Sequence, residues 1–181
     1  MSTTIFDFVG SNQGDWKVTA MTTLKGDSLA PITHLQKVAS TLEQSKTGIW
    51  TLKGVISNLR YTEKADKDKL VAIQEDLGRP QATLAAFIPI RKSEAWWNLA
   101  QDERRKIMEN KSQHTNTGMK YLPAIARKLF HSRDIGEAFD FLTYFEFAPE
   151  YSDAFEELLF ALRSTEEWTY IDREVDIRLA K

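Results

Sequence analysis

Residues 139–147 read Phe-Asp-Phe-Leu-Thr-Tyr-Phe-Glu-Phe, and this stretch decides the fold class. Every second residue from Phe139 to Phe147 is phenylalanine or threonine, while the residues between them include Asp140 and Glu146. A strand that is aromatic on one face and partly charged on the other favours an antiparallel sheet, because central parallel strands are usually apolar on both faces. We therefore predict an α+β fold in which helices cover one side of an antiparallel sheet. The other face of the sheet would be free to enclose a ligand.

Hydrophobic periodicity along the rest of the chain predicts strands and helices in alternation. The predicted strands are 15–25, 48–62, 82–90 and a last one carrying Val175, Ile177 and Leu179. A first helix is predicted from Pro31, with Leu35, Val38 and Leu42 on one face. A short helix follows the charged turn 63–69, with Leu70, Ile73 and Leu77 on one face and a cap at Gly78, and a helical region covers 93–117. Two more helices are predicted, one from Pro123 with Ile125, Leu129 and Phe130, and one with Phe155, Leu158, Leu159 and Leu162.

Length and composition are those of one ordinary globular domain, 1–181. Of the 181 residues 42% are hydrophobic and 28% are charged, and 24 Lys and Arg against 26 Asp and Glu give a net charge of −2. A nucleic-acid binder usually carries a basic excess, so we expect no nucleic-acid partner. No apolar run is long enough to span a membrane and no leader pattern is evident, so we expect a soluble, cytoplasmic protein.

The absence of cysteine excludes thiolate metal sites, cysteine nucleophiles and disulfides. The three histidines are too far apart in sequence for a His-x-x-x-His zinc motif, and neither a Gly-x-Ser-x-Gly elbow nor a phosphate-binding loop occurs. His114 lies seven residues after Ile107, so it can share that residue's inward helical face; taken alone, it is more often a core or capping histidine. A single histidine can complete an iron site where a haem supplies four nitrogens.

Five segments, in order, resemble the chlorite dismutase family. They are Ile88-Pro-Ile-Arg-Lys-Ser-Glu-Ala-Trp-Trp97, Ser112-Gln-His-Thr-Asn-Thr-Gly118, Lys120-Tyr-Leu-Pro-Ala-Ile-Ala-Arg127, Phe139-Asp-Phe-Leu-Thr143 and Thr165-Glu-Glu-Trp168. The resemblance spans Tyr61 to Leu179, about two thirds of the chain. Several matching segments in family order are far more specific than any one of them.

This resemblance implies a ferredoxin-like antiparallel α+β barrel covered by helices, of the dimeric α+β barrel type. A haem b would lie in the C-terminal half, 81–181, and the N-terminal ferredoxin-like half, 1–80, is shortened. The short N-terminal half resembles the small-subunit branch of the family, whose members are homodimers.

On the proximal side of the haem, the resemblance places His114 as the iron ligand. Glu167 matches the carboxylate that accepts the other ring N–H of that histidine, and Lys92 matches a basic residue beside it. A carboxylate bonded to the imidazole makes it more anionic and so stabilises the higher oxidation states of iron.

On the other side, Arg127 matches the distal arginine of the family, which would bind chlorite or another small anion. Trp96 and Trp97 match paired tryptophans near the haem, and we expect Tyr61 and Trp96 to contact its propionates. Gln74, on the predicted short helix, is expected to pair with Arg127.

Local sequence alone favours plainer interpretations of these residues. Arg127 would be a solvated charge on a helix, Lys92 a surface charge flanking a helix, Glu167 a helix-end carboxylate and Gln74 a solvent-facing amide. The simultaneous match to several family positions is what favours the site.

The reaction that the resemblance implies is the conversion of chlorite to chloride and dioxygen. Two alternatives stay open: a coprohaem decarboxylase of haem biosynthesis, which generally lacks the distal arginine, and a haem-binding module without turnover. The second would keep His114 but would not need Arg127 or Glu167.

Overall fold

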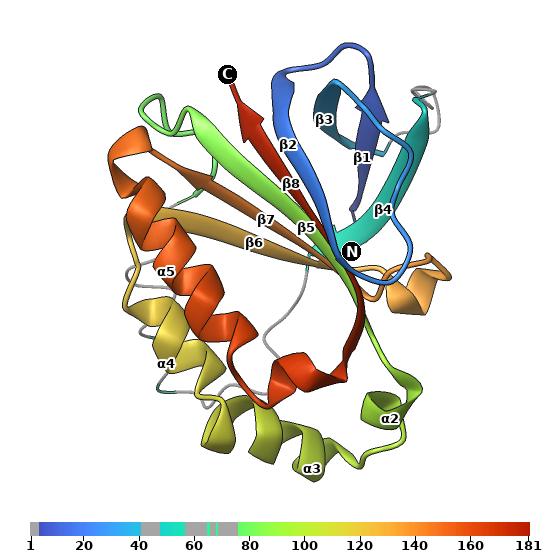
Figure 1. Ribbon diagram of the computed structural model, residues 1–181, viewed down its shortest axis with the longest axis vertical. Helices are drawn as coiled ribbons and strands as arrows, with labels where there is room; N and C mark the ends of the chain where they lie inside the picture. Colours follow the sequence, from blue (N-terminus) through green and yellow to red (C-terminus); the bar gives the residue numbers. More distant parts are fainter. Residues whose placement is uncertain (1–3, 41–47, 57–64, 66–67, 69–75) are drawn as a thin grey trace.

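Eight antiparallel strands close into a barrel in the order β1-β3-β2-β8-β5-β7-β6-β4 (Figure 1). The structure is a computed structural model that describes residues 4–40, 48–56, 65, 68 and 76–181. The strands are β1 Ile5–Ser11, β2 Trp16–Lys25, β3 His34–Ala39, β4 Trp50–Ile56, β5 Leu84–Lys92, β6 Ile125–His131, β7 Phe141–Phe147 and β8 Ile171–Ala180.

In the described part of the chain, α-helices and a π-helical segment lie outside the barrel, on the side of β5, β6 and β7 (Figure 1). They are α2 Glu94–Trp97, α3 Gln101–Arg105, the π-helical segment η1 Lys106–Lys111, α4 His114–Met119 and α5 Ser152–Arg163. Short 3-10 turns are η2 Arg133–Ile135, η3 Pro149–Tyr151 and η4 Glu167–Tyr170. The predicted α+β class with helices on one side is confirmed, and the helical region 93–117 is divided into several short helices.

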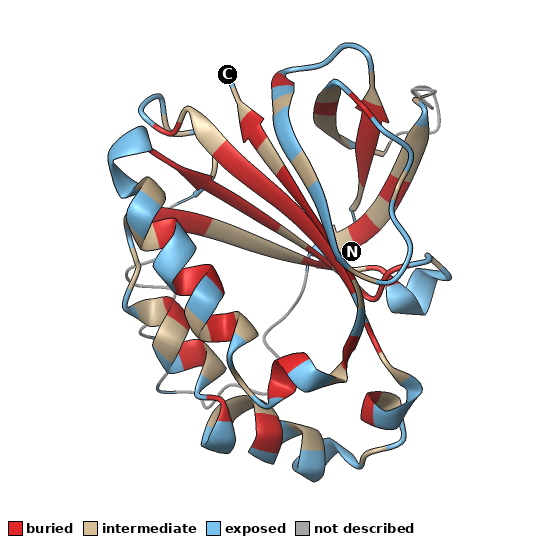
Figure 2. Ribbon diagram, in the orientation of Figure 1, coloured by how far each residue is buried: buried red, intermediate tan, exposed pale blue. Residues whose placement is uncertain are grey.

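Strand β7 shows how the two faces of the sheet are used. Leu142 and Tyr144 join the cluster inside the barrel, whereas Phe145 and Phe147 pack outward against Phe155 of α5. Figure 2 shows the buried residues of α5 on the side that faces the strands. The alternation that predicted this strand therefore separates two apolar cores, one on each face.

The interior of the barrel is filled with side chains. Phe8 stacks on Phe87 with ring centroids 4.4 Å apart and meets Phe130 edge-on at 5.0 Å. The expectation that this face would enclose a ligand was wrong, because the sheet closes on itself and its inner side chains pack against one another.

The helix predicted from Pro31 is wrong, since residues 34–39 form β3. Leu35 and Val38 have helical spacing, but β3 pairs with β1 at six successive positions and places Leu35 inside the barrel. In so short a segment, pairing with a neighbouring strand outweighs the local pattern. Leu42 lies outside the described residues.

The helix predicted from Pro123 is also a strand, β6, which pairs with β7 along its whole length and with β4 at its end. As a strand, β6 places Ile125 in the outer core and Phe130 in the barrel, which a single helical face could not do. Arg127 therefore projects from a sheet and not from a helix.

The remaining strands match their predictions closely, except that β1 was not predicted. The strand predicted at 48–62 is described as β4, and residues 57–64 lie outside the described residues, as do Leu70 and Ile73 of the predicted short helix. Within the described part of the chain, no helix is long and apolar enough to cross a membrane.

The stacked pair inside the barrel predicts a large loss of stability for one substitution and almost none for another. Phe87→Ala, at a fully buried side chain, should lower the free energy of unfolding by about 3–5 kcal/mol, because it leaves a cavity against Phe8. Phe160→Ala, at a side chain 75% exposed on α5, should change it by about 0.5 kcal/mol at most. Urea unfolding of both variants checks this, and equal shifts of the two midpoints would contradict the barrel core.

Candidate functional site

A buried carboxylate joins a lysine and a histidine at the C-terminal end of β5. Glu167 Oε1 accepts a hydrogen bond from Lys92 Nζ at 2.8 Å, and its Oε2 lies 2.8 Å from His114 Nδ1. The side chains of Lys92 and Glu167 are both 2% exposed, while that of His114 is 20% exposed. The histidine is thus held at Nδ1 by a buried carboxylate, while part of its ring is exposed to solvent.

Three different elements supply these residues, so the array exists only in the folded chain. Lys92 ends β5, His114 begins α4, and Glu167 begins the turn η4 that follows α5. Ser112, in the turn before α4, holds η4, because its Oγ accepts a hydrogen bond from the backbone N–H of Glu167 at 3.2 Å. The next residue, Gln113, has φ +48°, a left-handed turn that separates η1 from α4.

The electrostatics of the array favour an ionised carboxylate. Burial alone would raise the pKa of Glu167, but the charges and hydrogen bonds of His114 and Lys92 outweigh it and hold the pKa at about 2. Burial lowers the pKa of the Lys92 ammonium, and the charge of Glu167 acts in the opposite direction. The carboxylate is therefore an anionic hydrogen-bond acceptor for His114 at neutral pH.

Trp96, the first of two adjacent tryptophans in α2, lies against the lysine of the array. Lys92 Nζ lies 3.5 Å from the ring centroid of Trp96, which is fully buried and meets Tyr170 edge-on. A cation over an aromatic face is stabilised by the ring quadrupole, so Trp96 holds the ammonium in place beside its carboxylate.

Trp97 is fixed by a second buried acid, Asp140. Asp140 Oδ2 accepts the backbone N–H of Lys92 at 2.7 Å and Nε1–H of Trp97 at 3.1 Å. The guanidinium of Arg133 lies over the Trp97 ring, 4.1 Å from its centroid. Asp140 thereby fastens α2 to the end of β5. The sequence predicts only that Asp140 lies on the polar face of its strand, because its partners Lys92 and Trp97 are 48 and 43 positions away.

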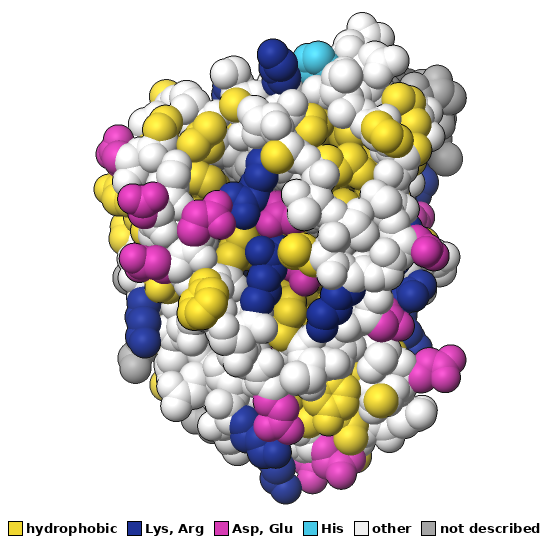
Figure 3. All heavy atoms as spheres, viewed as in Figure 1, with side chains coloured by type: hydrophobic (Ala, Val, Ile, Leu, Met, Phe, Trp, Pro, Cys, Tyr) yellow, Lys and Arg dark blue, Asp and Glu magenta, His cyan; other side chains and the backbone are white. Residues whose placement is uncertain are grey.

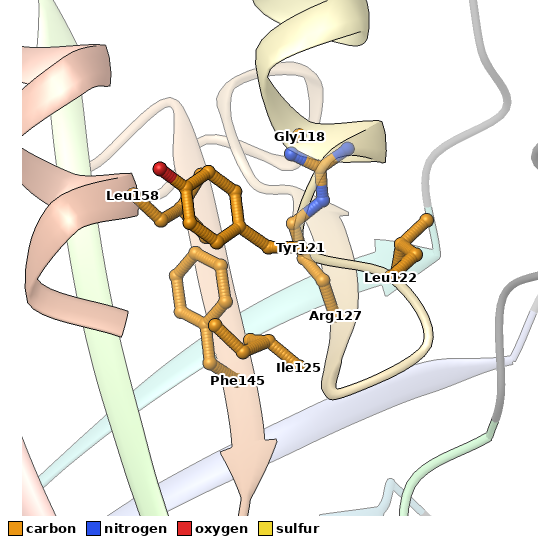
Figure 4. Close-up of a pocket in the computed structure, with 7 residues that line it drawn as sticks. All are labelled: Gly118, Tyr121, Leu122, Ile125, Arg127, Phe145 and Leu158. Carbon is orange, nitrogen blue, oxygen red and sulfur yellow. The ribbon is translucent and has the colours of Figure 1, made fainter. Parts of the chain in front are cut away.

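A small pocket lies beside the array, between α4, α5 and the sheet (Figure 4). Its lining is apolar except for one arginine and one tyrosine hydroxyl: Gly118, Tyr121, Leu122, Ile125, Arg127, Phe145 and Leu158. Figure 4 shows the guanidinium of Arg127 pointing toward Gly118 on α4. A Cβ atom at Gly118 would lie 3.3 Å from Arg127 Nη1, so glycine permits this close approach.

Gly118 lies one helical turn after His114, and therefore Arg127 faces the same helix that carries the histidine. Burial lowers the pKa of Arg127, while the charges of Glu167 and Glu109 act in the opposite direction. Low polarity strengthens electrostatic attraction, so a guanidinium in apolar surroundings can attract a small anion.

Of the residues predicted for the site, the structure brings together Lys92, His114, Glu167 and Trp96. Arg127 lies against Gly118 of α4, and Trp97 is bonded to Asp140. The expected positions of Tyr61 and Gln74 lie outside the described residues. Gly118 was missed, because only the tertiary approach of Arg127 makes its lack of a side chain significant.

The fold and the array define an α+β barrel protein with a carboxylate-bound histidine in a partly buried site. The family model for chlorite dismutase matches residues 2–181. The chain belongs to the chlorite dismutase family.

Individual relatives agree with this assignment. The structure superposes on that of dimeric chlorite dismutases from Nitrobacter winogradskyi with a TM-score of 0.90, at 52% identity, covering 97% of this chain and 99% of the other. A chlorite dismutase structure from Candidatus Nitrospira defluvii in complex with imidazole gives a TM-score of 0.59 at 27% identity, over 82% of this chain and 57% of the other.

The chlorite dismutase of Ideonella dechloratans is 37% identical over 101 residues, which are 53% of this chain and 33% of that protein. The matched region is therefore about a third of the length of this curated relative.

The low pKa of Glu167 predicts how stability depends on pH. Because its folded pKa of about 2 lies below the ordinary 4.5, the ionised carboxylate stabilises the fold above pH 4.5, and this contribution is lost as the pH falls toward 2. Relative to Glu167→Gln, the wild type should lose up to about 3 kcal/mol more of its free energy of unfolding between pH 5 and pH 2.

Urea unfolding of the ligand-free protein at several pH values checks this. Glu166→Gln is the matched control, since Glu166 is exposed and pairs only at the surface with Lys111. It should follow the wild type, and parallel curves for wild type and Glu167→Gln would contradict the assignment.

Proposed function

We propose that the protein is a haem b enzyme that converts chlorite to chloride and dioxygen. The observation that carries the proposal is the hydrogen-bonded array of Lys92, Glu167 and His114. His114 begins α4, and one turn later on this helix Gly118 lies against Arg127. We propose His114 as the iron ligand and Arg127 as the anion-binding residue. The C-terminal half, 81–181, would then hold the haem, and the shortened half, 1–80, would complete the barrel.

The donor chemistry of the site fits a haem. His114 is held at Nδ1 by a carboxylate, which leaves Nε2 as the nitrogen that can bind iron. Among the described residues at the site, His114 is the one imidazole that can bind iron. A haem requires one such ligand from the protein, because its macrocycle supplies the other four nitrogens. A bound haem would supply an electron-rich iron at which Cl–O bonds can break and an O–O bond can form.

The chain's own residues act on the proton and the anion. Glu167 accepts the Nδ1 proton of His114 in a hydrogen bond, which raises the basicity of the ring toward a metal. Lys92 balances the buried charge, so the carboxylate stays ionised while it holds that proton. Trp96 and Trp97 would lie near the haem, and Tyr61 and Trp96 would contact its propionates.

Arg127 would bind chlorite through its guanidinium and then retain the hypochlorite fragment that remains after the first Cl–O bond breaks. By holding hypochlorite in the pocket, Arg127 would favour completion of the overall conversion of chlorite to chloride and dioxygen over release of this oxidant. The apolar walls around Arg127, including Phe145 and Leu158, exclude water and strengthen the attraction for the anion. Gln74 is proposed to pair with Arg127.

The Nitrobacter relative is described as dimeric, and its likeness extends over nearly the whole of both chains. We therefore propose a homodimer. Oxygen evolution on addition of chlorite to the purified, haem-loaded protein tests the proposed activity. Haem binding without oxygen evolution would favour a coprohaem decarboxylase or a haem-binding module instead.

His114→Ala should lose most of its haem and all turnover, because the iron loses its protein ligand. His34→Ala is the matched control, since His34 lies on β3 and bonds only its neighbour Thr33 among the contacts described. Haem content per chain and the Soret spectrum measure the effect. Full haem occupancy with an unchanged spectrum in His114→Ala would show that another residue binds the iron.

Arg127→Ala should keep its haem, but the rate constant for chlorite should fall roughly 10–100-fold, as expected for the loss of about 1.5–3 kcal/mol of charge-assisted binding. It should also release more hypochlorite, so that monochlorodimedone is chlorinated faster per chlorite consumed. Lys128→Ala is the control, because Lys128 is the next residue on β6 and pairs with Asp76. Equal chlorination by wild type and Arg127→Ala would remove Arg127 from the mechanism.

A further inference from the structure

Glu174 is a buried acid that has no role in the proposed mechanism. It lies on the outer face of β8, is 1% exposed, and receives two hydrogen bonds. Arg163 Nε donates to Oε1 at 2.8 Å, and the indole Nε1–H of Trp168 donates to Oε2 at 2.8 Å. Each carboxylate oxygen is therefore committed to a different partner.

The same arginine also pairs with Asp176 at 2.9 Å, and Arg178 pairs with Asp176 and with Glu156. In Figure 3 basic and acidic side chains gather in the band between α5 and β2, where β8 runs. Burying such a network generally contributes little net stability, since the loss of hydration offsets the attraction, and apolar residues of similar size often serve as well. A buried acid in this position therefore needs an explanation other than stability.

Trp168 directly follows Glu167 in the turn η4, and this turn is held at several further points. Lys25 Nζ donates to the carbonyl of Trp168 at 2.9 Å, and the backbone N–H of Ser93 donates to the carbonyl of Tyr170 at 2.7 Å. Ser93 is the residue after Lys92. The turn is thus joined to the strand that carries the lysine partner of Glu167.

We propose that Glu174 is a positioning residue for Glu167. By fixing the indole of Trp168, it sets the rotation of η4 and so holds the Glu167 carboxylate between His114 and Lys92. The inference rests on the proposed haem function for its consequence at the iron, but the positioning itself is a property of the folded chain.

The geometry makes this positioning necessary. Both oxygens of Glu167 are used, one at 2.8 Å from Lys92 and one at 2.8 Å from His114, so a rotation of the turn that improves one contact lengthens the other. Functional groups of this kind need to be held within about 0.5 Å of their working geometry by the residues behind them. The ring of Trp168 packs in the outer core, and the bond from its N–H to Glu174 fixes how the ring is turned there.

Three variants separate positioning from general stability. Trp168→Phe removes the N–H and keeps most of the ring; Glu174→Gln leaves one amide oxygen for two donors; and the double variant combines them. Asp176→Asn is the matched control, because it weakens the same arginine network without touching Trp168.

The first readout needs no haem. Hydrogen exchange of the Glu167 amide, which donates to Ser112, should be roughly 2–10-fold faster in Trp168→Phe and Glu174→Gln, and unchanged in Asp176→Asn. The double variant should exchange no faster than the single ones, since both remove the same interaction.

The second readout is the iron–histidine stretching band of the ferrous haem-loaded protein. Trp168→Phe and Glu174→Gln should shift it to lower frequency, in the same direction as Glu167→Gln but by less, because a displaced carboxylate bonds His114 more weakly. Asp176→Asn should leave the band in place even if it lowers the melting temperature.

Unchanged exchange and an unchanged band in Trp168→Phe and Glu174→Gln, while Glu167→Gln shifts the band, would overturn the proposal. Equal effects of Asp176→Asn on both readouts would also overturn it, since they would reflect stability alone. If the wild type takes up no haem, the proposed function fails, and the exchange comparison by itself decides whether Glu174 positions the turn.

Discussion

The ionised carboxylate of Glu167 lies in the interior with a lysine on one oxygen and a histidine on the other. An isolated buried charge would cost several kcal/mol, so this arrangement requires that both partners stay in place. Lys92 in turn is held by the face of Trp96 and by the backbone bond to Asp140. The chemistry proposed for His114 depends on this one buried charge, because the carboxylate determines which ring nitrogen a metal can use.

The barrel supplies the rigidity that such an array needs. Its inner face is filled by an aromatic core, and its outer face, covered by α5, carries both the apolar wall of the pocket and the arginine network around Glu174. The array sits where β5 ends and β8 begins, since Lys92 pairs with Ile171, the residue directly after the turn that carries Glu167. Lys92 is therefore positioned by a strand, and Glu167 by a short turn joined to the neighbouring strand.

The sequence predicted the α+β class and the strand 139–147 because that strand separates two faces with different chemistry. It predicted β3 and β6 wrongly as helices, since Leu35–Val38 and Ile125–Leu129 have spacings that both structures allow, and only pairing with β1 and β7 decides between them. The family resemblance predicted His114, Glu167 and Lys92 as site residues, and the structure joins these three side chains by hydrogen bonds. Local pattern could not identify Asp140, Gly118 or Glu174, because their contacts join residues 6 to 48 positions apart and depend on the folded structure.

The most direct test is the ferric/ferrous potential of the protein loaded with the proposed haem, with and without the charge at Glu167. Glu167→Gln keeps the shape and an acceptor for His114 but removes the negative charge, so the haem should stay bound and its potential should rise, since a neutral acceptor pulls less on the imidazole proton. Glu166→Gln, at the neighbouring exposed acid, should leave the potential where it is. A potential that is the same in the wild type and in Glu167→Gln would contradict the claim that the buried carboxylate controls the histidine.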